Sequence, residues 1–211
     1  LQEGGLALEC NENERDEMGQ ILAGRPIWLA SMVQLDELKT ILDAHRKASR
    51  MALRLLLIIV PDDETDGDEF LEQLRHEGFN TAVWSEGDVP DETCQVLLAD
   101  TWGDLGLWYR LSPVTLMASS LKQGYGGGDP YEPAALGSAV LYGPHVGKHL
   151  ETYSRFASAG AARIVKDAES LSAALQRLLA PDQAALMAAA GWEVATDGAE
   201  VTDKVINLVL G

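Results

Sequence analysis

The sequence has little cysteine, little positive charge and no long hydrophobic run. Its two cysteines, Cys10 and Cys94, lie far apart without Cys-x-x-Cys spacing, which gives neither a zinc-site signature nor a disulfide framework. A reducing compartment is therefore the simpler interpretation. A membrane-spanning helix needs roughly 18 consecutive apolar residues. The apolar run at residues 53–60 is far shorter and is predicted to be a buried strand.

Cations are outnumbered two to one. The 211 residues include 16 Lys and Arg against 33 Asp and Glu, a formal net charge of −17. Such a chain repels nucleic-acid phosphates and anionic lipids over most of its surface. We therefore expect no nucleic-acid partner. Any anion that binds must be held by backbone N–H groups or by a few well-placed cations.

A sizeable core is nevertheless available. Hydrophobic residues make up 46% of the chain and charged residues 23%, which excludes global disorder. The length suits one large domain, or one of two similar halves of a larger protein. The first residue is Leu1 rather than Met, so we expect this chain to be part of a longer one.

Short apolar segments alternate with helical patterns about seven times. This alternation predicts βαβ units and an α/β fold, a Rossmann-like doubly wound parallel sheet whose ligands bind at the carboxyl ends of the strands. We predict a linker and short helix at 1–24, the Rossmann-like domain at 25–195 and a carboxyl-terminal helix at 196–211. The predicted strands lie at 25–31, 53–60, 79–85, 94–100, 113–119, 138–143 and 161–165.

The most unusual stretch is "GYGGGDPYEPAALG" at residues 124–137. Its glycines allow the backbone to approach a ligand closely, and Asp129-Pro130 precedes a predicted helix start, where free N–H groups attract anions. In this interpretation Glu132 accepts hydrogen bonds from a ribose. In the alternative, Asp129 is the helix N-cap, Glu132 is its capping-box partner, and the glycines only form a tight loop. The two interpretations are compatible.

Other candidate residues carry weaker signals. Trp102 follows a predicted strand, where stacking on a base and packing in the core are both possible; Trp28 and Trp84 are predicted to be core. His145 is either a binding-cleft residue or a packed one. The remaining histidines, His45, His76 and His149, fall on helical patterns and are predicted at the surface or its boundary. The acidic run at 61–69 is predicted to be a solvated loop, with a weak cation site as the alternative.

One family resemblance covers roughly residues 22–190. "SSLKQGYGGGDPYEPAALGSAVLYGPH" (119–145) resembles the carboxyl-terminal signature of the 3-deoxy-D-manno-octulosonic acid (Kdo) transferases, Gly-Gly-His-Asn-Pro-hydrophobic-Glu-Pro-Ala followed by Gly-Pro-His. "RPIWLAS", "AHR", "LLLIIVP" and "QVLLADTWGDLGLWY" match further segments in order. The resemblance implies the carboxyl-terminal, donor-binding half of a two-domain GT-B glycosyltransferase.

The resemblance also implies roles for individual positions. Those matching the family's nucleotide-binding segments are Ser31, Pro61, Asp62, Trp102, Gly103, Asp104, Gly126, Gly127, Gly128, Asp129, Pro130, Tyr131 and Glu132. No catalytic residue is expected in this chain, because the family's general base is a glutamate of the amino-terminal domain. No metal and no cofactor are implied.

The departures from the family pattern are mostly toward acidity. The family's Arg-His after Pro61 is Asp62-Asp63 here, and its His-Asn is Gly128-Asp129. A carboxylate about 4 Å from a phosphate costs on the order of 1 kcal/mol in water and several times more in a half-buried cleft. Lys122 or Lys148 compensates, the donor sits differently, or activity has changed.

The resulting expectation is a glycosyltransferase domain that binds a cytidine monophosphate (CMP)-activated, Kdo-like sugar. Its acceptor would be lipid A or a precursor, held with the membrane surface by the missing domain, in lipopolysaccharide core synthesis at the cytoplasmic face of the bacterial inner membrane. We expect this chain alone to be inactive. The alternatives are a divergent pseudoenzyme or binding module, and a UDP-sugar epimerase of the same GT-B shape.

Overall fold

A computed structural model describes residues 8–210 and confirms the predicted α/β fold. All seven strands are parallel and form one sheet in the order β3-β4-β2-β1-β5-β6-β7. Each predicted strand is present, although the structure shortens most of them. Their bounds are β1 Ile27–Val33, β2 Leu56–Pro61, β3 Thr81–Val83, β4 Val96–Leu98, β5 Val114–Met117, β6 Ala139–Tyr142 and β7 Ala162–Ile164.

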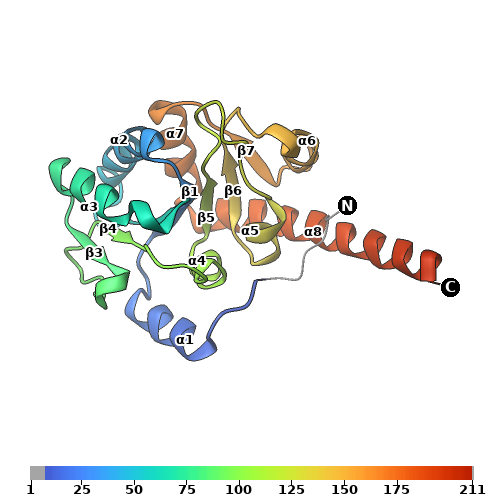
Figure 1. The fold of residues 1–211 in the computed structure, drawn as a ribbon, viewed down its shortest axis with the longest axis horizontal. Coiled ribbons are helices and arrows are strands. Elements are labelled where there is room, and N and C mark those ends of the chain that lie inside the picture. The colour runs from blue at the N-terminus through green and yellow to red at the C-terminus, as the bar shows by residue number, and fades with distance from the viewer. Residues whose placement is uncertain (1–7, 211) are drawn as a thin grey trace.

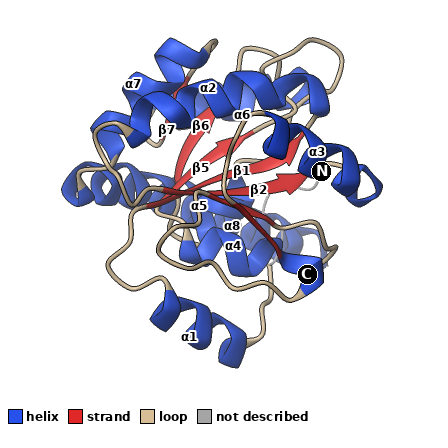
Figure 2. Cartoon of the chain, turned by 90° about the vertical axis from the view of Figure 1, so that its left-hand side faces the viewer, coloured by secondary structure: helices blue, strands red, loops and turns tan. Residues whose placement is uncertain are grey.

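Helices cover both faces of the sheet. Figure 2 shows α2 and α7 on one side and α1, α4 and α8 on the other. This arrangement follows from strands that are apolar on both faces, as in a buried parallel sheet. The helices are α1 Glu12–Ile21, α2 Leu38–Ser49, α3 Gly67–His76, α4 Leu105–Leu111, α5 Tyr131–Ala135, α6 Leu150–Ser158, α7 Ala168–Leu178 and α8 Pro181–Leu210.

The alternation of side chains along β1 divides the core into two clusters. Trp28 and Ala30 pack with α2, α3 and α7, whereas Ile27 and Leu29 pack with α1, α4, α5 and α6. The sheet therefore sets the positions of the helices on both sides. It also fixes where each strand ends, which decides where loops from distant parts of the sequence meet.

His45 lies in the first cluster, and its predicted surface position is wrong. It is completely buried on α2, where its Nδ1 accepts a hydrogen bond from the Trp28 indole at 3.1 Å and its Nε2 lies 2.9 Å from the Gln95 carbonyl oxygen. Burial lowers the pKa of His45 to about 4. The neutral ring thus joins α2 to β1 and to the start of β4, a role that helical periodicity does not reveal.

The carboxyl-terminal helix is longer than predicted. α8 runs from Pro181 to Leu210 and passes through the predicted boundary at 195/196 without a break. Figure 1 shows it as the red helix that projects past the rest of the molecule. At the other end of the chain, α1 and the turn at Gly24 agree with the predicted short helix, while residues 1–7 of the predicted linker lie outside the described residues.

The order of the strands marks where a ligand is expected. β1 has β2 on one side and β5 on the other, so the chain reverses its direction across the sheet at this point. In open parallel sheets the crevice outside the carboxyl ends of such strands is the usual ligand site. None of the helices within the described part of the chain combines the length and apolar character that crossing a membrane requires.

Candidate functional site

A cleft of about 680 Å³ opens at the carboxyl ends of β1, β2 and β4. The strand ends contribute Met32, Val60, Pro61 and Ala99, which form an apolar floor. The loops that follow β2 and β4 supply the polar walls. The remaining lining residues are Leu8, Glu9, Asp62, Glu64, Asp100, Thr101, Trp102, Gly103, Leu105, Gly106 and Glu132.

The polar lining of the cleft is acidic. Five acidic residues line it, and Lys, Arg and His are absent among the described residues that line it. The Asp100 carboxylate already has partners within the protein, because it accepts hydrogen bonds from the Ser85 N–H at 2.9 Å and the Ser85 hydroxyl at 2.6 Å. The others are Glu9, Asp62, Glu64 and Glu132. A ligand here needs hydroxyl or amide donors to satisfy these oxygens.

Glu132 is the half-buried member of this set. It lies in the first turn of α5 and faces the cleft, as the sequence predicts for a ribose-binding carboxylate. Burial and the nearby charge of Asp129 raise the pKa of Glu132. The ionised form of the side chain is therefore disfavoured by its surroundings, and a hydrogen-bond donor from a ligand would stabilise it.

Trp102 stands at the rim of the cleft. Its side chain is 84% exposed, so the interpretation of Trp102 as a core residue is wrong. The two residues after it, Gly103 with φ +93° and Asp104, turn the chain into α4, and Asp104 accepts a hydrogen bond from the Thr101 hydroxyl at 2.5 Å. An exposed indole beside an apolar floor suits stacking on a flat ring. Trp28 and Trp108 are fully buried, and Trp84 packs edge-on against Trp108.

The glycine loop makes protein contacts of its own. The Gly127 N–H donates to the Ser119 carbonyl at 2.8 Å. A side chain at Gly128 would overlap the end of Met32, while the Gly128 carbonyl accepts a hydrogen bond from the Tyr153 hydroxyl at 2.8 Å. The neighbouring Gly126 has φ +88° and lines a separate groove. These contacts agree with the tight-loop interpretation.

The start of α5 departs from the predicted cap. Pro130 is the N-cap, and the Asp129 carboxylate accepts a hydrogen bond from the Tyr131 N–H at 2.9 Å. This bond occupies one of the amides that were expected to face a ligand. The Tyr131 ring turns away and packs edge-on against Phe156, with ring centres 5.2 Å apart. Of the matched residues 126–132, Glu132 alone is among the described residues that line the cleft.

Ser31, another residue that matches the family's nucleotide-binding segments, is also buried within the fold. It is fully buried within β1, where its hydroxyl lies 3.3 Å from the Tyr109 hydroxyl and 3.4 Å from the Met117 sulfur. It joins β1 to β5 and α4 rather than reaching the cleft. Pro61 and Asp62, at the end of the second strand, do line the cleft.

His145 lies in a neighbouring groove. This groove has a volume of about 550 Å³ and separates the loop after β5 from the loop after β6. Gly126, Gly147 and Leu150 are among its lining residues. His145 is exposed there, so it is not part of the acidic cleft.

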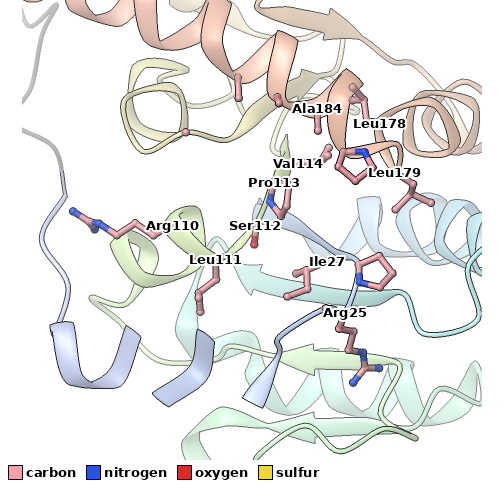
Figure 3. A pocket seen from close by; sticks show the side chains of 16 residues that line it. Arg25, Ile27, Arg110, Leu111, Ser112, Pro113, Val114, Leu178, Leu179 and Ala184 are labelled. Atoms are coloured by element: carbon pink, nitrogen blue, oxygen red, sulfur yellow. The ribbon is translucent and has the colours of Figure 1, made fainter. Parts of the chain in front are cut away.

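A third cavity opens at the amino-terminal ends of the strands, opposite the cleft (Figure 3). It has a volume of about 580 Å³ and lies where β1 and β5 begin, beside the junction of α7 and α8. Its lining is mostly apolar, with Ile27, Val114 and Leu178 among the labelled side chains. The amino ends of parallel strands are not the usual ligand edge. The acidic cleft is therefore the stronger candidate site.

Several lining residues escaped the prediction from sequence. Asp100 and Thr101 lie two and three residues after the end of β4, so their positions in the loop after this strand would have identified them. Glu9 reaches the cleft because Gly106 on α4 leaves room for the backbone of residue 9. No local pattern predicts that contact. Among the described residues, no group of three His, Cys, Asp or Glu side chains is placed to hold a metal ion.

Comparison with known proteins gives concordant results. The 3-deoxy-D-manno-octulosonic acid transferase of Haemophilus influenzae is 28% identical over 187 residues, which is 88% of this chain and 44% of that protein. Its counterpart from Bordetella pertussis is 34% identical over 162 residues, or 75% of this chain and 37% of that protein. The chain thus spans less than half the length of these curated relatives. No protein-family model matches the sequence.

Among solved structures, the C-terminal CMP-Kdo binding domain of WaaA from Acinetobacter baumannii superposes with a TM-score of 0.80. The two are 26% identical, and the match covers 87% of this chain and 98% of that domain. The strand order, the cleft at the reversal point and this superposition define the class, a carboxyl-terminal Rossmann-like domain of the GT-B architecture. Within that class the chain belongs with the carboxyl-terminal domains of the Kdo transferases, which confirms the resemblance predicted from its sequence.

Proposed function

We propose that this chain is the donor-binding domain of a glycosyltransferase, and that its acidic cleft binds a CMP-activated, Kdo-like sugar. The observation that carries the proposal is the position of Glu132. The residue that matches the family signature outright is also a half-buried carboxylate that faces the cleft at the carboxyl edge of the sheet. The similarity to a domain described as CMP-Kdo binding supports the identity of the donor.

The cleft suggests how each part of the nucleotide would be held. Glu132 would accept hydrogen bonds from the two ribose hydroxyls, which would offset its unfavourable charge. The exposed ring of Trp102 would stack on the cytosine, an interaction worth about 1–3 kcal/mol per base in other proteins. The backbone of Pro61 and Asp62 would border the phosphate. Pro130 and Tyr131 would support Glu132 from beneath through α5.

The full-length protein would transfer the sugar to lipid A or a precursor, in lipopolysaccharide core synthesis at the cytoplasmic face of the inner membrane. The amino-terminal half would supply the acceptor site and the general base that deprotonates the acceptor hydroxyl. This chain would stabilise the departing CMP. The alternative of a divergent binding module rests on a specific feature: Asp62 and Asp63 stand where the family has Arg-His.

A ligand panel tests the proposal. Isothermal titration of the purified chain with CMP, UMP and a UDP-linked sugar should give binding for CMP, with weaker or no binding for the others. The variant E132A should lose CMP affinity by tenfold or more, because the ribose hydroxyls lose their acceptor. Glu151→Ala, a substitution on the exposed surface of α6, is the matched control and should bind as the parent does.

Each alternative predicts a different pattern of binding across this set of ligands. Preference for the UDP-linked sugar would support the epimerase interpretation and contradict ours. Absence of binding to all nucleotides would indicate that the acidic replacements have removed the donor site. Transfer of Kdo by the full-length protein would exclude a pseudoenzyme.

A further inference from the structure

Glu37 is a buried carboxylate that faces backbone amides instead of a cation. It ends the short 3-10 turn after β1 and is completely inaccessible to solvent. One carboxylate oxygen accepts hydrogen bonds from the N–H groups of Ser119 at 2.7 Å and Gln34 at 3.0 Å. The other accepts from Ser120 at 3.2 Å and Leu121 at 3.0 Å. Three consecutive amides of the loop after β5 thus converge on one side chain.

The backbone is strained at two positions near Glu37, one in the last residues of β1 and one in the loop after β5. Met32 and Ser119 have φ angles of 56° and 57°, in the left-handed region that residues with a side chain rarely adopt. Each such residue costs on the order of 1–3 kcal/mol and persists only where its surroundings enforce it. The Ser119 hydroxyl donates to the Met32 carbonyl at 2.6 Å and accepts from the side-chain amide (Nε2) of Gln34 at 3.0 Å. Glu37 and this pair of bonds hold the strained backbone in place.

The same segment also holds the glycine loop and the loop after β6. The Ser119 carbonyl accepts the Gly127 N–H at 2.8 Å, two residues before Asp129. The Ser120 hydroxyl accepts the Gly143 N–H at 2.8 Å, and its carbonyl accepts the His145 N–H at 2.9 Å. The position of this segment therefore decides the path of the glycine loop, which leads directly to α5 and Glu132.

We propose that Glu37 is a positioning residue of the donor site, whose carboxylate locks the loops after β1, β5 and β6 so that Glu132 is held at the cleft. The inference rests on the proposed function of the cleft. It also assigns the amides of residues 119–121 to Glu37, so the donor phosphate does not use them. Glu37 itself has no solvent-accessible surface, so its role would be to hold the loops rather than to contact the donor.

The test compares two variants that each lose a buried hydrogen bond. In Glu37→Gln an NH₂ group faces backbone donors, and the loop after β5 loses part of its anchor. Thr115→Val, on the same strand β5, removes a buried hydroxyl that lies 2.7 Å from the Ser138 hydroxyl, far from the cleft. Both should lower the melting temperature. Only Glu37→Gln should weaken CMP binding, by tenfold or more, at a temperature where both remain folded.

A double-mutant cycle separates positioning from general loosening. If Glu37 acts through Glu132, Glu37→Gln should cost little CMP affinity in a Glu132→Gln background, so the two effects should be strongly non-additive. Hydrogen exchange at the Ser119, Ser120 and Leu121 amides should also accelerate. CMP binding by Glu37→Gln equal to that of Thr115→Val, or fully additive effects, would overturn the proposal. Failure of the parent chain to bind CMP would instead overturn the proposed function, on which this role depends.

Discussion

Glu132 shows a conflict between stability and binding within one residue. Burial and Asp129 raise the pKa of its carboxyl, so the fold favours the protonated form. An acid whose pKa rises on folding contributes stability at pH values below its unfolded pKa, and that contribution disappears as the pH rises through the folded value. At neutral pH the ionised side chain therefore lowers the stability of the fold.

Glu132→Gln should consequently raise the melting temperature at pH 7 while it weakens CMP binding. The gain should shrink toward about pH 4, where the parent carboxyl is protonated as well. Thermal unfolding of the two proteins at pH 7 and pH 4, combined with titration of CMP, measures both effects. A lower melting temperature for the variant at pH 7 would show that Glu132 has a structural role that its surroundings do not suggest.

For single residues, a strand end or a motif was enough to locate some of those that line the cleft, although their binding of a nucleotide stays a prediction. Glu132, Pro61, Asp62 and Trp102 are these residues. Prediction from sequence did less well where a side chain depends on distant partners. The burial of Ser31 against Tyr109 and the three amides of residues 119–121 on Glu37 are contacts between segments far apart in the chain, which no local pattern encodes.

At the scale of elements, the seven strands were predictable because each is a short apolar run between helical patterns. The loops were less predictable, because some of their glycines are needed where the backbone of another loop lies too close for a side chain. Gly143 is an example: a side chain there would overlap the carbonyl group of Ser120, whose hydroxyl also binds the Gly143 N–H. The loops after β5 and β6 are therefore packed backbone to backbone.

Gly143→Ala should destabilise the protein by about 3 kcal/mol, the upper end of typical overpacking costs, because backbone atoms cannot move aside as a flexible side chain would. Gly19→Ala is the matched control. Gly19 is exposed within α1 and has free space around it, so alanine should stabilise that helix by up to about 1 kcal/mol. Urea unfolding measures both changes. Equal stability of the two variants would contradict the close packing of these loops.

At the scale of the whole molecule, charge opposes the proposed ligand. The chain carries a net charge of −17, the cleft is lined by carboxylates, and CMP is itself an anion. Added salt screens repulsion between exposed charges. CMP affinity should therefore rise, roughly twofold or more, as sodium chloride increases from about 50 to 300 mM. Uncharged cytidine should show little change over the same range. A fall in CMP affinity with salt would mean that cations dominate the site.

The domain boundaries at 24/25 and 195/196 remain predictions. The chain covers 44% of one curated relative and 37% of another. α8 projects beyond the sheet and its helices (Figure 1), with Ile206 and Leu208 among its exposed apolar residues. Nucleotide binding in the cleft is therefore the part of the proposed function that can be tested with this chain.

A crystal structure of the chain soaked with CMP tests the central claim most directly. The account predicts CMP in the cleft at the ends of β1, β2 and β4, its ribose hydroxyls about 3 Å from the Glu132 carboxylate and its base against Trp102. Nucleotide bound in the groove beside His145, or in the cavity at the amino-terminal ends of the strands, would contradict it. So would a Glu132 side chain turned away from a nucleotide that does occupy the cleft.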